Sequence, residues 1–226
     1  MPNTAAGHAG GAPSRTVEWY FDFLSPFAYM QSFRLGELPD DVEVVFRPIL
    51  FGGLLVHWET KGPGQIPPKR LLTLRHTLWH SKRLGVPCNL PPKFPFNPLK
   101  TLRLALSLGS DQATIDTIFR CIWKDGLLPE DEAGWQGIVD ALGISRDDAD
   151  ARVQTPEVKE ALVENGHRAV EAGVFGVPTF IHDGVVFWGA DETDFLLDVL
   201  ANPGLLAGEE MARIETLPVG QRPGTD

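Results

Sequence analysis

Ser25 and Pro26 stand at the point in this chain where the sequence most favours chemistry. They follow an apolar run, Val17–Phe23, and precede a helical pattern. Serine is preferred at a helix N-cap and proline at the first helical position, so we predict a buried strand that passes directly into a helix. That arrangement places an exposed hydroxyl at a helix end that favours anions, including a thiolate. A helix cap alone, worth about 1 kcal/mol, is the simpler interpretation.

A second motif, Gly173–Phe180, lies near the other end of the chain and strengthens the first interpretation. Its glycines form a turn that leads through Val177 and Pro178 into a short strand. We predict a cis peptide bond between these two residues, although most bonds before proline are trans. With that geometry the N–H and C=O groups of Val177 would face outward and pair with a peptide ligand as a further strand would. The alternative is a proline that simply begins a strand.

A third motif, Gly189–Glu192, has two interpretations. As local structure it is a turn followed by a helix start, where acidic residues are favourable. As a binding site it would anchor an amino-acid-like group. Asp191 would then accept hydrogen bonds from the ammonium, and the N–H groups of Ala190 and Asp191 would hold the carboxylate.

Two further segments could contribute to the same site. Lys61–Gly64, together with Lys69, could hold a carboxylate or form a solvated loop. Phe94–Pro98 could line a pocket for an aromatic substrate or pack between helices. Trp58 and Trp188 lie near these motifs and are expected to flank the site.

The cysteines and histidines predict no redox or metal centre. Cys88 and Cys121 do not form a C-x-x-C motif and have apolar neighbours, so we expect structural thiols. His76 and His80 are four residues apart on a predicted helix, but no third zinc ligand accompanies them.

The composition is that of a soluble globular protein, because 43% of the 226 residues are hydrophobic and 22% are charged. The net charge of −10 argues against nucleic acid and anionic membranes as partners. No segment approaches the roughly 20 apolar residues of a membrane span. We expect a cytoplasmic protein, with a disordered extension over residues 1–15 and a loose tail over residues 203–226.

The remaining pattern predicts an α/β domain in two halves. Strands at Val17–Phe23 and Val42–Arg47 flank a helix at Ser25–Leu38, which is the order of a parallel β-α-β unit. A hairpin at 179–188 with an Asp-Gly turn follows much later, and a helix at Glu192–Leu200 comes after it.

The sequence between these halves is helical. The expected helices are Pro68–Leu84, Leu99–Leu108, Asp111–Lys124, Glu130–Leu142 and Glu157–Ala172. In the first of them Leu71, Leu74 and Leu78 fall on one face. We therefore predict one domain formed by residues 16–50 and 173–202, with residues 51–172 inserted as an all-helical domain.

Three motifs together, Phe21–Tyr29, Gly173–Thr179 and Trp188–Asp191, resemble the 2-hydroxychromene-2-carboxylate isomerase family. That family is related to kappa-class glutathione transferases and to the DsbA-type thioredoxin fold. The resemblance covers about residues 17–200. It implies a thioredoxin-like α/β domain, glutathione as cofactor, a small aromatic carboxylate as substrate, and a homodimer.

The resemblance also implies how glutathione would be held. Ser25 would bind the sulfur and stabilise the thiolate, and Val177, before a cis Pro178, would pair with the cysteinyl backbone. The γ-glutamyl end would be held by Ala190 and Asp191.

At the other end of the ligand, Lys61 would approach the glycyl carboxylate. The aromatic substrate would contact Phe27, Trp58 and Asn97. One departure is Glu192, where the family commonly has arginine, because it removes a cation beside the γ-glutamyl site and adds an anion.

The implied activity is a glutathione-dependent cis–trans isomerisation. Addition of the thiolate turns a double bond of the substrate into a single bond, which rotates before the thiolate leaves. The alternatives are a kappa-like glutathione transferase or peroxidase, and a non-catalytic binding module of the same fold. A disulfide oxidoreductase is disfavoured because Ser25-Pro26-Phe27-Ala28 contains no cysteine.

Overall fold

A computed structural model describes residues 14–214, 216–218 and 220. The extension expected over residues 1–15 lies outside the described part as far as residue 13. Arg15 already belongs to the first strand, since it pairs with Val42 and its guanidinium contacts Asp41.

The centre of the fold is a four-stranded sheet with the order β2-β1-β3-β4. The strands are β1 (Arg15–Phe21), β2 (Val42–Pro48), β3 (Thr179–His182) and β4 (Val185–Trp188). β1 and β2 are parallel, and the other neighbours are antiparallel. The predicted β-α-β unit and the predicted hairpin are therefore confirmed. At the hairpin turn Asp183 and Gly184 have φ values of 48° and 79°, as a tight two-residue turn requires.

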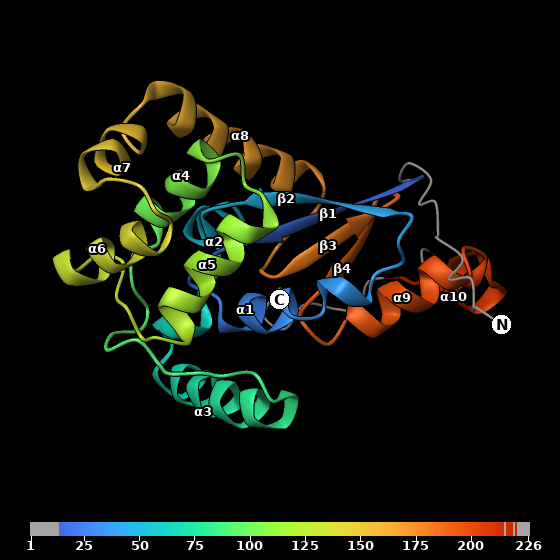
Figure 1. Ribbon diagram of the computed structural model, residues 1–226. Coiled ribbons are helices and arrows are strands. Elements are labelled where there is room, and N and C mark those ends of the chain that lie inside the picture. Colours follow the sequence, from blue (N-terminus) through green and yellow to red (C-terminus); the bar gives the residue numbers. More distant parts are fainter. Residues whose placement is uncertain (1–13, 215, 219, 221–226) are drawn as a thin grey trace, which may run out of the picture.

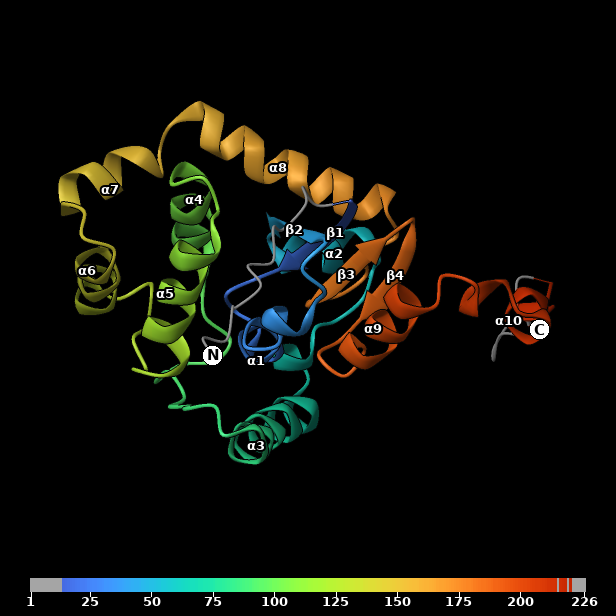
Figure 2. The same cartoon turned by 45° about the vertical axis from the view of Figure 1, so that its right-hand side comes forward.

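Helices cover both faces of this sheet because the side chains of β1 alternate between two apolar clusters (Figures 1 and 2). Trp19 and Phe21 pack with α1 (Pro26–Ser32) and α9 (Thr193–Ala201). Tyr20 points to the other face, where α2 (Phe51–His57) and α8 (Pro156–Glu171) lie. The carboxyl end of β1 is therefore enclosed between layers, and α1 begins there.

The predicted helical insertion is confirmed between β2 and β3. After α2 it contains α3 (Pro67–Leu84), α4 (Leu99–Ser107), α5 (Gln112–Trp123), α6 (Glu132–Ala141) and α7 (Arg146–Arg152), and it ends with α8. The side chains of Asp111 and Thr155 cap α5 and α8, where the sequence placed helix starts. The predicted domain boundaries at residues 51 and 172 stay a prediction.

Three helical segments differ from expectation. α1 ends at Ser32 rather than Leu38, and a single 3-10 turn, Leu35–Glu37, follows around Gly36, which disfavours a continuous helix. The sequence did not predict α2, whose two glycines lower helix propensity, or α7, which is almost entirely polar. A short helix, α10 (Glu209–Ile214), lies in the tail.

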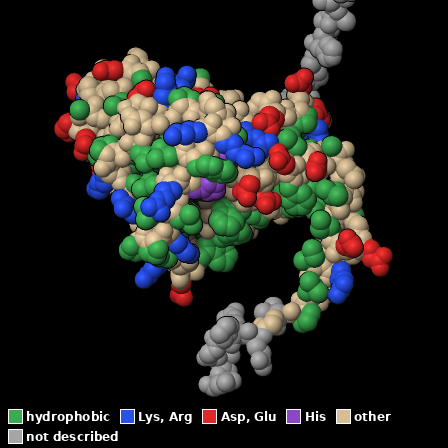
Figure 3. Space-filling view, turned by 90° about the horizontal axis from the view of Figure 1, so that it is seen from below, with side chains coloured by type: hydrophobic (Ala, Val, Ile, Leu, Met, Phe, Trp, Pro, Cys, Tyr) green, Lys and Arg blue, Asp and Glu red, His purple; other side chains and the backbone are tan. Residues whose placement is uncertain are grey.

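The α3 helix departs most from a core helix. Leu71 and Leu78, expected on one apolar face, are 49% and 38% exposed, and Trp79 is 55% exposed, whereas Thr77 and Ser81 are buried. Figure 3 shows hydrophobic side chains gathered near histidine on the face seen from below, the side on which α3 lies. Within the described residues, α3 and the other helices lack the combination of length and apolarity that a bilayer span needs.

Candidate functional site

Two of the three predicted motifs, Ser25-Pro26 and Gly173–Phe180, meet around a cavity of about 770 Å³ at the carboxyl end of β1. Its wall includes five of the residues singled out from the sequence: Ser25, Phe27, Trp58, Lys61 and Val177. The volume lies in the range of pockets that bind small molecules. The cavity therefore combines contributions from both halves of the sheet domain and from the helical insertion.

Ser25 caps α1 as predicted. Its Oγ accepts a hydrogen bond from the N–H of Ala28 at 3.2 Å and donates to the carbonyl of Val177 at 3.4 Å. The residue is only 8% exposed, so the hydroxyl is less exposed than we expected, and it lies in the cavity wall against Val177. Since the bond to Val177 is long, the hydroxyl proton is weakly engaged and available to a better acceptor.

The peptide bond between Val177 and Pro178 is cis, as predicted. The carbonyl of Val177 accepts the hydrogen bond from Ser25, which lies 152 positions away in the chain. The two motifs therefore form one site. Among the described residues, no hydrogen bond engages the N–H of Val177. The Thr179 hydroxyl fixes the preceding turn by donating to the carbonyl of Gly176 at 2.8 Å. A free backbone N–H beside the hydroxyl is what main-chain pairing with an extended ligand requires.

The wall contains six aromatic side chains, those of Phe27, Phe51, Trp58, Phe94, Phe175 and Trp188. Trp58 is anchored because its Nε1–H donates to the carbonyl of Val174 at 3.0 Å. Phe175 and Trp188 pack edge to face, with ring centroids 5.0 Å apart. A Cβ at Gly176 would lie 2.3 Å from Nε1 of Trp188, so the indole can approach this closely only over glycine.

The charged groups at this cavity are cationic. Lys61 and Lys69 lie in the wall, and no Asp or Glu is among the described residues that line it. Neither lysine forms an ion pair within the described part of the chain. This electrostatic environment favours a carboxylate, although the chain as a whole is acidic.

Asn97 is the predicted substrate residue that the structure does not bring to the cavity. Its side-chain oxygen accepts from the N–H of Leu99 at 3.0 Å and so caps the start of α4. The neighbouring Phe94 and Pro95 line the cavity instead. Of the two interpretations of this segment, Phe94 and Pro95 follow the first and line the pocket, whereas Phe96 packs in the core and Asn97 serves local structure.

Ala190 and Asp191 lie in the wall of a second cavity, of about 430 Å³, rather than in the first. α1 connects the two spaces, because Phe27 at its beginning lines the first and Met30 lines the second, together with Arg34 just beyond the end of the helix. An extended ligand that spans both would run beside α1.

Asp22 is a residue of the site that the sequence analysis missed. It is fully buried and accepts hydrogen bonds from the N–H groups of Leu24 and Phe51, both at 2.9 Å. Burial raises its pKa from 3.8 to about 7. Leu24 and Phe51 both line the cavity. The buried carboxylate of Asp22, which binds both of their N–H groups, therefore links two parts of the cavity wall. The sequence does contain a signal for Asp22, because it is a carboxylate within the apolar run that ends at Phe23.

The cysteines lie away from the cavity wall, in agreement with structural thiols. Cys121 is buried in α5 and Cys88 is partly buried. Burial raises the pKa of both thiols, which makes them poor nucleophiles at neutral pH. The residues that occupy the start of α1 are Ser25 and Pro26, so the site contains no thiol of its own.

Residues 16–201 match the family model of the DSBA-like thioredoxin domain. The chain belongs to the DsbA-like thioredoxin family. The predicted fold class, a thioredoxin-like α/β domain with a helical insertion, is thereby confirmed. As a member of that family with serine at the start of α1, it lacks the cysteine on which thiol–disulfide exchange depends.

Curated relatives of this DsbA-like protein carry the names that the motifs suggested. The 2-hydroxychromene-2-carboxylate isomerase of Sphingobium xenophagum is 28% identical over 190 residues, which covers 81% of this chain and 96% of the relative. Glutathione S-transferase kappa 1 of Homo sapiens is 26% identical over 209 residues, covering 84% and 93%. The resemblance stated from the motifs thus extends along nearly the whole of both relatives.

Solved structures agree on the fold. A 2-hydroxychromene-2-carboxylate isomerase superposes with a TM-score of 0.74 at 22% identity, covering 89% of this chain and 98% of that chain. A probable DsbA oxidoreductase from Streptomyces coelicolor superposes with a TM-score of 0.62 at 18% identity, covering 93% and 94%. At these identities the likeness concerns the fold alone.

Proposed function

We propose that this protein is a glutathione-dependent cis–trans isomerase of a small aromatic carboxylate similar to 2-hydroxychromene-2-carboxylate. The observation that carries the proposal is the meeting of Ser25 and Val177 in an aromatic cavity that has lysines and no acidic side chain among its described wall residues. The similarity to proteins named as isomerases of that compound supports the choice of reaction.

Several features of the cavity fit glutathione. The unpaired N–H of Val177 beside the cis bond suits main-chain pairing with the cysteinyl unit. Lys61 and Lys69 suit the glycyl carboxylate. With a volume of about 770 Å³, the cavity also leaves room for an aromatic ring against Phe27 and Trp58.

The residues of the chain would each contribute a distinct effect. Bound glutathione would supply a thiolate nucleophile for reversible addition to the substrate's double bond. Because its lone pair already accepts from Ala28, Ser25 would direct its proton toward the sulfur position. The aromatic wall would exclude water and so strengthen that hydrogen bond. The lysines would orient carboxylates.

Product analysis separates the proposed reaction from its closest alternative. Incubation with 2-hydroxychromene-2-carboxylate and glutathione should convert the substrate to its isomer and return the glutathione unchanged. Release of a glutathione conjugate would instead establish a transferase, which the kappa relatives favour as the second candidate. A protein that binds no glutathione would be neither, and the non-catalytic binding module would then replace both.

Asp191→Ala should weaken glutathione binding much more than it slows turnover at saturation. We propose that its carboxylate anchors the γ-glutamyl ammonium, and loss of a charge-assisted hydrogen bond should raise the Kd about tenfold or more. Turnover at saturating glutathione should change by no more than about twofold, because the reacting sulfur lies at the other cavity. Calorimetry and steady-state kinetics measure the two quantities.

Asp198→Ala is the matched control for that experiment. Asp198 lies on α9, the helix that follows Asp191, but lines neither cavity. This variant should bind glutathione as the unchanged protein does. Equal affinity of the Asp191 variant and its control would rule the anchor out.

The resemblance also implies a homodimer, which we propose for this chain. The exposed apolar side chains of α3, among them Leu71, Leu72 and Trp79, support this assembly because they would be removed from water in an interface. Sedimentation equilibrium should give twice the chain mass of 24.8 kDa, and the chain mass itself would contradict the proposal.

A further inference from the structure

The second cavity is formed by three elements that are distant in the chain. Met30 comes from α1, and Arg34 from the turn just after it. His80 and Leu84 belong to α3, and the segment that opens α9 contributes Ala190, Asp191 and Asp194. Its described wall therefore places a guanidinium, an imidazole and two carboxylates around about 430 Å³ of space. Mixed charge of this kind complements a zwitterion better than a group of one sign.

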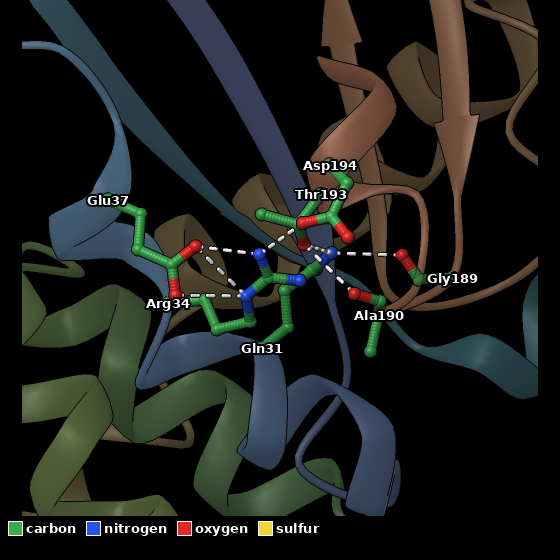
Figure 4. Close-up of polar contacts among 7 residues, drawn as sticks. All are labelled: Gln31, Arg34, Glu37, Gly189, Ala190, Thr193 and Asp194. Atoms are coloured by element: carbon green, nitrogen blue, oxygen red, sulfur yellow. Dashed lines mark hydrogen bonds and ion pairs between the residues drawn. The ribbon is translucent and has the colours of Figure 1, made fainter. Parts of the chain in front are cut away.

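Side chains hold the carbonyl groups of the turn before α9, as Figure 4 shows. Gln31 donates to the carbonyl of Gly189 at 2.9 Å and to the Thr193 hydroxyl at 3.1 Å, and that hydroxyl donates to the carbonyl of Ala190 at 3.0 Å. The carbonyls of the turn are thus engaged. No hydrogen bond among the described residues uses the N–H groups of Ala190 and Asp191.

Arg34 is held rigidly beside this turn. Its Nε and Nη2 atoms donate to Glu37, and Nη2 also donates to Asp194, so the guanidinium lies between two carboxylates, as Figure 4 shows. Nη1 donates to no acceptor in the part of the chain that the structure describes. Two N–H bonds therefore remain for an anionic group, in the planar geometry that arginine offers to a carboxylate.

His80 brings an imidazole to the same cavity. Its Nδ1 is buried, out of reach of a ligand, and has no hydrogen-bond partner among the described residues, so a neutral ring carries its proton on Nε2 at lower cost. Its ring stacks on His76, with centroids 5.5 Å apart. Burial, with His76, Arg83 and Arg34 nearby, lowers the pKa of His80, and Asp191 opposes this. A neutral imidazole can donate one hydrogen bond.

We propose that Arg34 and His80 form the carboxylate-binding side of an amino-acid head-group site, in which Nη1 of Arg34, the imidazole of His80 and the free N–H of Ala190 bind the α-carboxylate while Asp191 accepts from the α-ammonium. This inference rests on the proposed use of glutathione, whose γ-glutamyl end carries such a head group. The two side chains then compensate for Glu192, which stands where the resemblance predicts a cationic arginine.

Binding of two ligands by three variants tests the assignment. The ligands are glutathione and 4-aminobutyryl-Cys-Gly, which lacks only the α-carboxylate. The variants are His80→Phe, which keeps a ring against His76, Arg34→Gln, and the control His76→Phe, which alters the stacked neighbour outside the cavity. Calorimetry at neutral pH gives each Kd, and thermal unfolding verifies that each variant is folded.

Each of the first two variants should raise the Kd of glutathione about tenfold and that of 4-aminobutyryl-Cys-Gly by no more than about twofold. His76→Phe should change neither value appreciably. Equal losses for both ligands, or no loss for glutathione, would overturn the inference and leave the proposed function standing. Failure of the unchanged protein to bind either ligand would overturn the proposed function together with the inference. Because His80→Phe breaks no ion pair, it decides the matter even if Arg34→Gln is unstable.

Discussion

Ser25→Ala is expected to lose most of the turnover while the fold is retained. The hydroxyl is the one side-chain donor at the start of α1 that is weakly engaged, since its bond to Val177 is 3.4 Å long. A hydrogen bond to a charged acceptor is worth about 1.5–3 kcal/mol, which corresponds to about one to two pKa units of a bound thiol. Turnover near neutral pH should therefore fall about ten- to a hundredfold.

The backbone at this position cannot replace the hydroxyl. α1 is only seven residues long, so its dipole is small, and Pro26 contributes no N–H. The side chain must therefore supply most of the stabilisation of a thiolate. Ultraviolet absorbance of the thiolate in the glutathione complex, followed as a function of pH, measures the shift directly and separately from turnover.

Two comparisons make the result specific. Ser25→Thr keeps a hydroxyl and should retain a thiolate band near neutral pH. Ser32→Ala removes a hydroxyl of the same helix that donates to the carbonyl of Tyr29 and lines neither cavity, so turnover should be unchanged. Because the helix cap stabilises the fold by about 1 kcal/mol, Ser25→Ala should also unfold at a slightly lower temperature. Wild-type turnover in Ser25→Ala would contradict the role of this hydroxyl.

The features that the sequence predicted well are those determined by neighbouring residues. Ser25-Pro26 predicted where α1 begins, and Asp183-Gly184 predicted the hairpin turn, because caps and tight turns depend on local backbone preferences. Alternation in the strands predicted the sheet. The meeting of Ser25 with Val177 followed once two halves of one sheet were inferred.

The features that the sequence missed depend on contacts between distant segments. Asn97 was expected at the substrate, but whether its amide faces a pocket or caps α4 is decided by how the loop packs. The spacing of Leu71 and Leu78 indicated an apolar face on α3. Spacing does not tell whether another part of the same chain packs against that face, and here both side chains are exposed. Arg34, just after α1, and His80, on α3, meet only in the folded chain.

The second large effect that we expect is a pH dependence of the protein's stability, which Asp22 causes. The free energy of unfolding should fall as the pH rises from about 4 to about 7, because the folded chain keeps a proton on Asp22 that the unfolded chain has lost. Burial raises this pKa from 3.8 to about 7 and outweighs the hydrogen bonds from Leu24 and Phe51, which lower it. A shift of this size corresponds to about 4 kcal/mol.

Asp22→Asn should remove most of this pH dependence, since asparagine does not titrate. Urea unfolding at about pH 4 and about pH 8 should show the unchanged protein losing stability relative to the variant across that interval. Asp198→Asn, at an exposed carboxylate of α9, should leave the dependence as it is. Parallel curves for the protein and Asp22→Asn would contradict the prediction.

The same titration also bears on the cavity. The ionised carboxylate satisfies both backbone N–H groups that it joins, whereas the protonated form offers them one good acceptor. Ionisation of Asp22 therefore lowers the free energy of unfolding. It also strengthens the hydrogen bonds that hold Leu24 and Phe51, two parts of the cavity wall, in place. Asp22→Asn should accordingly weaken glutathione binding above about pH 7 even where it stabilises the protein, and a variant that gains stability and binds equally well would show that Asp22 serves the fold alone.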